Sequence, residues 1–325
     1  MGWWQVGADT LANSRFVVSP LAEAVAGLLV LERAIAAHPG ERAWLETHLP
    51  AYRRWKADDP VSALVIGAAL APRWIADFLI PVPDPAPPGQ APPSFADELR
   101  PVRATPPDRA RADLAEAVRG PLPAALDRDD LARRAADALE WVWTHTVLPD
   151  WPRRRRILEA DVVARSAQLG RGGWADALNG MRSGIRWLGD GRLQINTHDN
   201  PPRELDGAQL LFVPVTPYQS WVCWDIPRRY GLVYPCSGAL ADAGRIPVPA
   251  ALGALIGPAR AAVLLLLASP LSTTQLVALT GQGLGSVGRH LRILLDAGLV
   301  RRRRAGRSVL YFRTEAGDVL VHGAS

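Results

Sequence analysis

The stretch Gly283-Leu-Gly-Ser-Val-Gly-Arg-His-Leu-Arg-Ile-Leu-Leu-Asp-Ala-Gly298 decides the fold of the carboxyl-terminal part of this 325-residue chain. Apolar residues recur at positions 284, 287, 291, 294 and 295, a spacing that turns one face of a helix toward a core. The opposite face carries Ser286, Arg289, His290 and Arg292. The pattern predicts an amphipathic helix whose outer face is polar and basic.

The glycines at the start of this helix allow a second interpretation. They match the G-x-G-x-x-G pattern of dinucleotide-binding loops, which needs a strand before it and an acidic residue about 20 positions after it. Upstream, however, Ser272 and Gln275 have the spacing of a capping box and predict a helix, and downstream an arginine run follows. The sequence therefore disfavours a nucleotide site.

The segments on either side favour a winged helix-turn-helix. A helix beginning at Ser272, a turn containing Gly281 and Gly283, and the helix described above make up the two-helix motif. Gly298 is placed to end the second helix in the left-handed region, which glycine enters most readily. Two strand-like segments with a basic turn between them, within residues 299–313, predict a β-hairpin that forms the wing.

This segment resembles the winged-helix domain of ArsR-type bacterial repressors. The resemblance rests on Leu276 with Leu279, Val287–Leu294, Ala297–Val300, Gly306-Arg307 and Val309–Tyr311. It implies binding to a double-stranded DNA operator. The family usually has serine or a similar small polar residue at the position of Gly288. Its metal-sensing members carry cysteines where this chain has Ala278–Thr280, so metal sensing is not implied.

A wider resemblance covers roughly residues 9–318. The chain looks like those ArsR-type regulators of actinobacteria that carry a long N-terminal region. The residues concerned are Ser19–Leu21 with Glu23, Phe78-Leu79, Ser94-Phe95, Trp151-Pro152, Leu205–Gly207, Leu210–Pro214 and Leu232–Pro235. This wider resemblance implies transcriptional regulation and does not identify the signal that the protein senses.

Positive charge is concentrated near the carboxyl-terminal end of the sequence. The whole chain has a formal net charge of +5, whereas residues 248–325 carry nine arginines against three acidic residues, a balance of +6. The remaining residues therefore sum to −1. A basic face confined to one domain is typical of nucleic-acid binding.

The predicted DNA-contacting residues lie on the second helix and on the wing. The helix residues are Ser286, Arg289, His290 and Arg292. The wing residues are Arg301, Arg302, Arg303, Arg304 and Arg307. We expect Arg289 to recognise guanine through two hydrogen bonds, and the wing arginines to meet phosphates or the minor groove. A solvated basic surface is the alternative for both sets.

The rest of the chain predicts an α+β fold, with a mostly helical N-terminal domain and a small antiparallel sheet before the winged helix. Helices are predicted at residues 20–38, 41–56, 60–79, 107–118, 129–148 and 151–169, with a proline-rich connection at 81–93. Short apolar segments between turn residues predict four or five strands after residue 183. The predicted boundaries are 1–182 and 183–247 for the helical and β parts of a sensor domain, and 248–325 for the DNA-binding domain.

Several classes of protein are disfavoured. Cys223 and Cys236 stand thirteen positions apart and form neither a zinc pattern nor a disulfide framework. We therefore expect a cytoplasmic protein in a reducing compartment, without a metal or a cofactor. The N-terminus lacks the charged and apolar regions of a signal peptide. The most apolar stretch, 248–268, is interrupted by prolines, glycines and an arginine, so no membrane partner is predicted.

A dense group of aromatic residues is the best indication of a ligand. The candidate ligand-binding residues are Trp141, Trp143, Trp151, Trp187, Tyr218, Trp221 and Trp224. Concave sites lined by aromatic rings bind flat organic molecules, which predicts a small aromatic or lipophilic effector. An ordinary aromatic core is the alternative. Trp221 and Trp224 lie three apart on a predicted strand, so we expect at most one of them to face a given pocket.

An enzyme that transforms an aromatic or lipophilic molecule is the alternative function. The sequence has no G-x-S-x-G, H-E-x-x-H, C-x-x-C or phosphate-loop motif. An acid–base pair would come from His145 with Asp150 or from His198-Asp199, and a nucleophile from Cys223 or Cys236. The favoured prediction is a dimeric transcriptional regulator, a repressor rather than an enzyme, whose effector weakens DNA binding.

Overall fold

The computed structural model describes residues 2–37, 39–87, 89–178, 181, 184–197, 201–236, 248–268, 270–280, 282–305 and 308–323. The chain folds into two compact units. One comprises Met1–Pro152 and Leu178–Cys236, and the other comprises Arg153–Ala177 and Ser237–Ser325. Residues 153–177 thus belong to the second unit, and the domain boundaries given above stay predictions.

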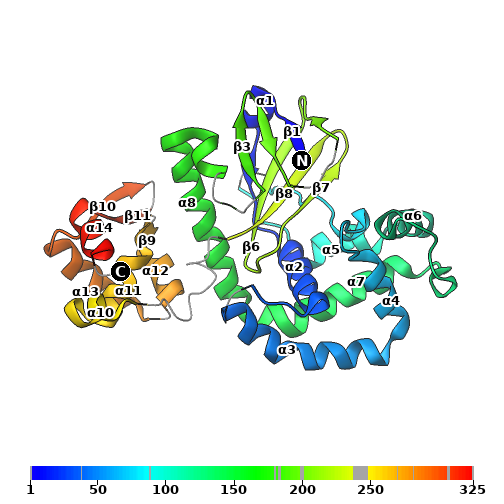
Figure 1. Cartoon of the computed structure of the whole chain (residues 1–325), viewed down its shortest axis with the longest axis horizontal. Coiled ribbons are helices and arrows are strands. Elements are labelled where there is room, and N and C mark those ends of the chain that lie inside the picture. Colours follow the sequence, from blue (N-terminus) through cyan, green and yellow to red (C-terminus); the bar gives the residue numbers. More distant parts are fainter. Residues whose placement is uncertain are drawn as a thin grey trace. The chain divides into compact units, whose positions relative to one another are not determined.

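The first unit is built around a helix that is buried on every side. This helix, α2 (Pro20–Arg33), begins as expected, because Ser19 Oγ accepts a hydrogen bond from the Ala22 N–H at 3.0 Å. Residues 20–31 are all buried, as a helix that is apolar all round must be. The other helices are α1 (Ala8–Ala12), α3 (Pro39–Asp58), α4 (Pro60–Ala69), α5 (Phe95–Arg103), α6 (Pro107–Val118) and α7 (Leu131–Val142). Figure 1 shows α3, α4 and α7 on one side of α2 and the strands on the other.

Several of the predicted helices have other bounds than predicted, and the first of them, predicted to reach residue 38, ends at Arg33. The helix predicted at residues 60–79 ends at Ala69, and a 3-10 turn follows at Asp77–Leu79. Pro72 lies in the segment between them, where its missing N–H and its ring oppose helix. Helix α7 continues as a π-helical turn, Trp143–Val147, and after a 3-10 turn α8 (Trp151–Leu178) follows, interrupted by the non-helical Gly173. The described part of the connection at 81–93 has no helix or strand, as predicted.

The strands that the structure describes in the first unit form two sheets of four strands each. The first has the order β3 (Arg186–Gly189), β4 (Arg192–Gln194), β1 (Trp3–Gln5), β5 (Arg203–Glu204). The second has the order β2 (Arg15–Phe16), β6 (Gln209–Val215), β8 (Arg229–Pro235), β7 (Trp221–Asp225). The prediction of one antiparallel sheet is wrong, because β1 pairs in parallel with β5, and β6 pairs in parallel with β2 and β8.

Burial accounts for the parallel pairing at the centre of the second sheet. In β6 and β8 every residue after the first is buried, so both faces of these strands are covered. Parallel central strands have such continuous apolar runs, whereas alternation is the mark of a half-exposed antiparallel strand. The buried strand β8 lies next to β6, and its hairpin partner β7 is the edge strand of the sheet.

Two buried glutamates join the helices to the loop that follows β6. Glu23 of α2 is fully buried and accepts hydrogen bonds from the backbone N–H of Thr216, at 2.8 Å, and from its hydroxyl. Glu41 of α3 is also buried and accepts a hydrogen bond from the backbone N–H of Tyr218 at 3.0 Å. Because buried carboxylates need such donors, these contacts fix the path of the chain into β7.

The carboxyl-terminal part of the second unit has the predicted helix-turn-helix followed by a hairpin. Its elements are α10 (Ala250–Ile256), α11 (Pro258–Leu266), β9 (Leu271–Ser272), α12 (Thr273–Thr280), α13 (Leu284–Asp296), β10 (Val300–Ala305), β11 (Ser308–Arg313) and α14 (Glu315–His322). The strands form an antiparallel sheet in the order β10, β11, β9. Figure 1 shows the hairpin of β10 and β11 in orange and red.

Local signals set the ends of the two motif helices. Ser272 Oγ accepts a hydrogen bond from the Gln275 N–H at 3.2 Å, and Gln275 Oε1 accepts one from the Ser272 N–H at 2.6 Å, which confirms the capping box. Gly298 has a φ of 68°, as predicted. The N–H of Leu299 then donates to the Leu294 carbonyl at 2.9 Å and closes the end of α13. Gly281 lies outside the described residues.

Candidate nucleic-acid interface

Helix α13 presents a polar outer face while its inner face is part of the core. Val287, Leu291 and Leu294 are buried, whereas Ser286, Arg289 and Arg292 are exposed. The predicted face therefore exists, and the three side chains project away from the core of the unit. A helix with this arrangement is suited to enter the major groove, where hydrogen-bond donors and acceptors on the base edges distinguish all four base pairs.

His290 differs from the other predicted contacts because it is half-buried. Its Nε2 lies 3.3 Å from Ser286 Oγ, and that hydroxyl also donates to Gln282 Oε1 at 3.1 Å. Burial lowers the pKa of His290, and the neighbouring charges of Arg260 and Arg289 lower it further. A neutral imidazole therefore orients the Ser286 hydroxyl, and the positive charge of this face comes from the arginines.

Leu284, the first residue of α13, lies outside the core. Leu284 was predicted on the buried face, but it is 63% exposed because the first residue of the helix projects beyond the edge of the core. Leu284 lies next to Gly285, whose missing Cβ would have met open space. An exposed leucine at this end of the helix is able to contact the methyl group of thymine, a role that periodicity alone did not indicate.

The four consecutive arginines of β10 are all exposed. Because side chains alternate along a strand, Arg301 and Arg303 point to one face of the hairpin and Arg302 and Arg304 to the other. The Arg301 guanidinium lies over the Phe312 ring, 5.9 Å from its centroid, which links the base of β10 to β11. Guanidinium groups on a projecting hairpin are suited to phosphate contacts. Arg307 lies outside the described residues.

The predicted aromatic ligand residues do not form one site. Trp143 is buried and stacks on Phe95 with ring centroids 4.6 Å apart, and Trp151 packs edge-on against Trp143 at 5.1 Å. Trp141 packs against the same helical core, in contact with Trp55 and His145. These three tryptophans therefore pack in an ordinary aromatic core, which was the alternative to a ligand site.

The remaining four aromatic residues lie in the β part of the first unit. Trp187 is half-buried on β3, and Tyr218 is 42% exposed in the loop before β7. Trp221 and Trp224 on β7 both line a cavity of about 670 Å³, together with Trp4 and Trp74. The expectation that only one of the pair faces a given pocket is wrong, because β7 is an edge strand and the cavity extends along its edge.

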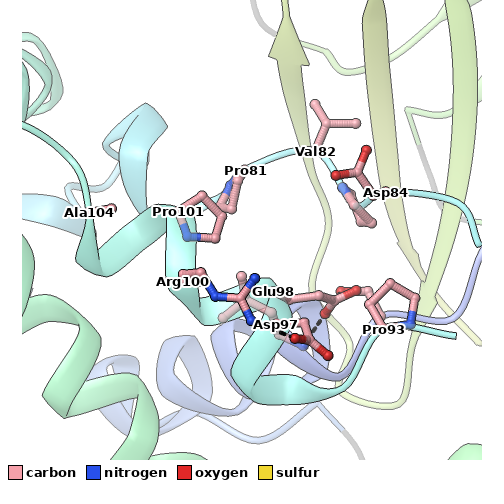
Figure 2. A pocket seen from close by; sticks show the side chains of 12 residues that line it. Pro81, Val82, Asp84, Pro93, Asp97, Glu98, Arg100, Pro101 and Ala104 are labelled. Carbon is pink, nitrogen blue, oxygen red and sulfur yellow. Dashed lines mark hydrogen bonds and ion pairs between the residues drawn. The ribbon is translucent and has the colours of Figure 1, made fainter.

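A second cavity, of about 460 Å³, lies between α5 and the proline-rich connection. Figure 2 shows Asp97, Glu98 and Arg100 of α5 on one side of it, and the rings of Pro81 and Pro101 close by. Glu98 Oε2 accepts hydrogen bonds from Ser19 Oγ and from the Leu21 N–H, both at 2.8 Å, at the start of α2. Burial raises the pKa of Glu98 to about 7.

Two of the residues considered for catalysis, Cys223 and His145, have surroundings that the structure describes. Burial, and then the charge of Asp77, raises the pKa of the buried Cys223 thiol to about 12, so the nucleophilic thiolate is disfavoured. The Nδ1 of the exposed His145 ring donates a hydrogen bond to the Trp141 carbonyl at 2.9 Å. His198-Asp199 lie outside the described residues. Within the described ranges, no group of three or more His, Cys, Asp or Glu side chains is placed to hold a metal ion.

Comparison with known protein families gives a match in the carboxyl-terminal part of the chain. A family model described as a helix-turn-helix domain matches residues 255–303, which run from α10 through α13 to β10. Neither the curated proteins nor the solved structures yield a match. In the described part of the chain, every helix is too short or too polar to cross a membrane. The match and the geometry together identify a helix-turn-helix DNA-binding domain near the carboxyl-terminal end, as in a regulator of transcription.

Proposed function

We propose that the protein is a transcriptional repressor of the ArsR type, in which α13 reads an operator and the hairpin of β10 and β11 contacts the adjacent backbone. The observation that carries this proposal is the exposed Arg289, which lies on the second helix of the motif between Ser286 and Arg292. Arginine is the side chain that most often recognises guanine, through a pair of hydrogen bonds.

The repressor acts as a homodimer on a two-fold symmetric operator. One helix-turn-helix contacts only a few base pairs, and paired heads about one helical turn apart reach the affinity that a specific site needs. The experiment is analytical ultracentrifugation of the protein with and without operator duplex. One protein chain per operator would overturn the dimer and leave the assignment of α13 intact.

The reading role of α13 is tested with duplexes that the protein selects from a random library. We expect Arg289→Ala to weaken binding to the selected duplex by about 1–3 kcal/mol, or roughly 5- to 150-fold, and to relax the choice of one base pair. Arg54→Ala is the control, because Arg54 is also exposed but lies on α3 of the first unit. If the Arg289 and Arg54 variants bind the selected duplex equally in fluorescence anisotropy, α13 does not recognise the operator sequence.

A small organic effector bound in the first unit controls the repressor. Such a ligand changes the affinity for DNA only by as much as it prefers one arrangement of the protein to another. The cavity that contains Trp221 and Trp224 supports this part of the proposal, because its volume is that of ordinary ligand sites. The test is the release of operator DNA on addition of a ligand that binds this cavity.

A further inference from the structure

The cavity beside β7 combines aromatic walls with an excess of positive charge. Among the residues that line it are three arginines, Arg33, Arg73 and Arg203, and one acidic residue, Asp77. All of them belong to the first unit. A purely lipophilic ligand would gain nothing from three guanidinium groups, whereas an anion would be attracted by them.

Arg203 is the best oriented of these cations. It lies on β5, and its guanidinium group stacks over the Trp224 ring, 4.3 Å from the centroid. Stacking holds the flat guanidinium group in one plane, so less conformational freedom is lost when its N–H groups bind a ligand. A carboxylate matches this fixed fork of donors, because its two oxygens accept two parallel hydrogen bonds.

The single carboxyl group of the cavity is already occupied by a neighbour. Trp224 Nε1 donates a hydrogen bond to Asp77 Oδ2 at 2.9 Å. Burial and then the charge of Asp113 raise the pKa of Asp77 to about 6, while the Trp224 hydrogen bond opposes the rise. Glu116 adds to the rise and Arg109 opposes it. At neutral pH Asp77 is therefore mostly ionised, so it holds the Trp224 ring and offsets one of the three arginine charges, which leaves the cavity with an excess of positive charge.

The walls of the cavity are suited to a flat molecule. The Trp74 and Trp224 rings lie with their centroids 5.5 Å apart at 55° to each other. The volume of about 670 Å³ is ample for a molecule of one to three fused rings.

We propose that this cavity binds an aromatic carboxylate, with the ring against Trp74 and Trp224 and the carboxylate bound by Arg203 and Arg73. This inference deepens the proposed function, because it gives the chemical class of the effector and the residues that recognise it. The negative charge of the ligand, rather than its apolar surface alone, is what the site selects.

The proposal is tested by isothermal titration calorimetry of the full-length protein at neutral pH. The probes are 1-naphthoate, 2-naphthoate and indole-3-carboxylate, each compared with the alcohol that has –CH2OH in place of the carboxylate. We expect at least one carboxylate to bind ten or more times more tightly than its alcohol, because the alcohol keeps the ring and loses the charge. If every acid binds no better than its alcohol, or none binds, the proposal is overturned.

Variants of the arginines locate the site. Arg203→Gln is expected to weaken the binding of the carboxylate tenfold or more and to leave the binding of its alcohol within twofold. Arg73→Gln gives an independent variant, because Arg73 is exposed and its loss leaves the packing unchanged. Arg54→Gln is the matched control on α3, outside the cavity. Carboxylate binding that is equal in all three variants would overturn the proposed site.

Ligand binding and DNA binding are measured separately, so that the two proposals fail separately. Calorimetry needs no DNA and reports on the cavity alone. Fluorescence anisotropy of the operator duplex, with and without the bound carboxylate, shows whether the ligand changes the affinity of the protein for DNA. A carboxylate that binds through Arg203 and leaves the affinity for operator unchanged supports the site and refutes effector control by this ligand class.

Discussion

At the scale of single residues, Glu98 shows how a distant side chain completes a local signal. Ser19 and Pro20 identify the start of α2 from the sequence alone, and the structure has that start. The Glu98 carboxylate that accepts hydrogen bonds from Ser19 and from Leu21 comes from α5, seventy-nine positions after Ser19. A sequence pattern predicts capping within four residues, but a partner that folding brings in has no local signal.

The pKa of Glu98 predicts how stability depends on pH. Because its pKa is about 7 in the folded protein against 4.5 ordinarily, the folded state favours the neutral acid. The stability it contributes is thus complete below pH 4.5 and is lost as the pH rises toward 7. Glu98→Gln keeps a neutral group at all pH values, so we expect it to equal the wild type at pH 4 and to exceed it by up to about 3 kcal/mol above pH 7.

Urea unfolding of both proteins across this range measures the difference. Glu46→Gln is the control, since Glu46 is exposed on α3 and far less of its surface is removed from water. A constant difference between the wild type and the Glu98 variant from pH 4 to pH 8 would mean that the folded-state pKa of Glu98 is unperturbed.

At the scale of elements, α13 offers two glycines with opposite roles. Gly288 lies inside the helix, and a Cβ added there would meet open space. Gly298 follows the helix with a φ of 68°, and a Cβ there would also meet open space. Because an added methyl group meets no neighbour at either position, substitution by alanine tests only the backbone conformation there.

We expect Gly288→Ala to stabilise the protein by about 0.5–1 kcal/mol, because alanine has the higher helix propensity. We expect Gly298→Ala to destabilise it by about 1 kcal/mol, because alanine enters the left-handed region at a cost. Thermal unfolding followed by circular dichroism compares the two variants. Shifts of the melting temperature with the same sign in both variants would show that backbone conformation does not determine the effect of these substitutions.

The helices of this chain were easier to predict than the strands, for a physical reason. Capping residues, prolines and apolar periodicity lie within each helix, so α2, α6 and α13 follow from their own sequences. The order of strands depends on partners elsewhere in the chain. The continuous apolar runs of β6 and β8 indicate buried strands but do not show which strands they pair with, and β1 and β2 are too short to show a period.

At the scale of the whole molecule, the distribution of charge confines DNA affinity to one region. The basic excess lies within residues 248–325, and the rest of the chain is nearly neutral. This feature was visible in the sequence, because charge needs no folding to be counted. The cavity beside β7 was not visible in the sequence, because its arginines come from α2, from the segment after α4 and from β5.

The exposed arginines of β10 predict a steep dependence of DNA binding on salt. Each phosphate contact releases condensed counterions, and the slope of log affinity against log salt is about −0.9 per contact. We expect Arg302→Gln and Arg303→Gln each to reduce this slope by about 1 and to weaken selected and random duplexes equally. Anisotropy titrations at several salt concentrations measure the slope. A loss confined to the selected duplex would instead assign these arginines to base reading.

The place of β1 inside its sheet has a consequence for synthesis on the ribosome. Its neighbours are β4 and β5, which lie almost two hundred positions later in the chain, so Trp3–Gln5 have no strand to pair with until those residues have left the exit tunnel. Trp3–Gln5 are thus translated long before their native partners. A nascent chain of this protein carries these residues unpaired while the intervening residues are synthesised, which is when chaperones would meet them.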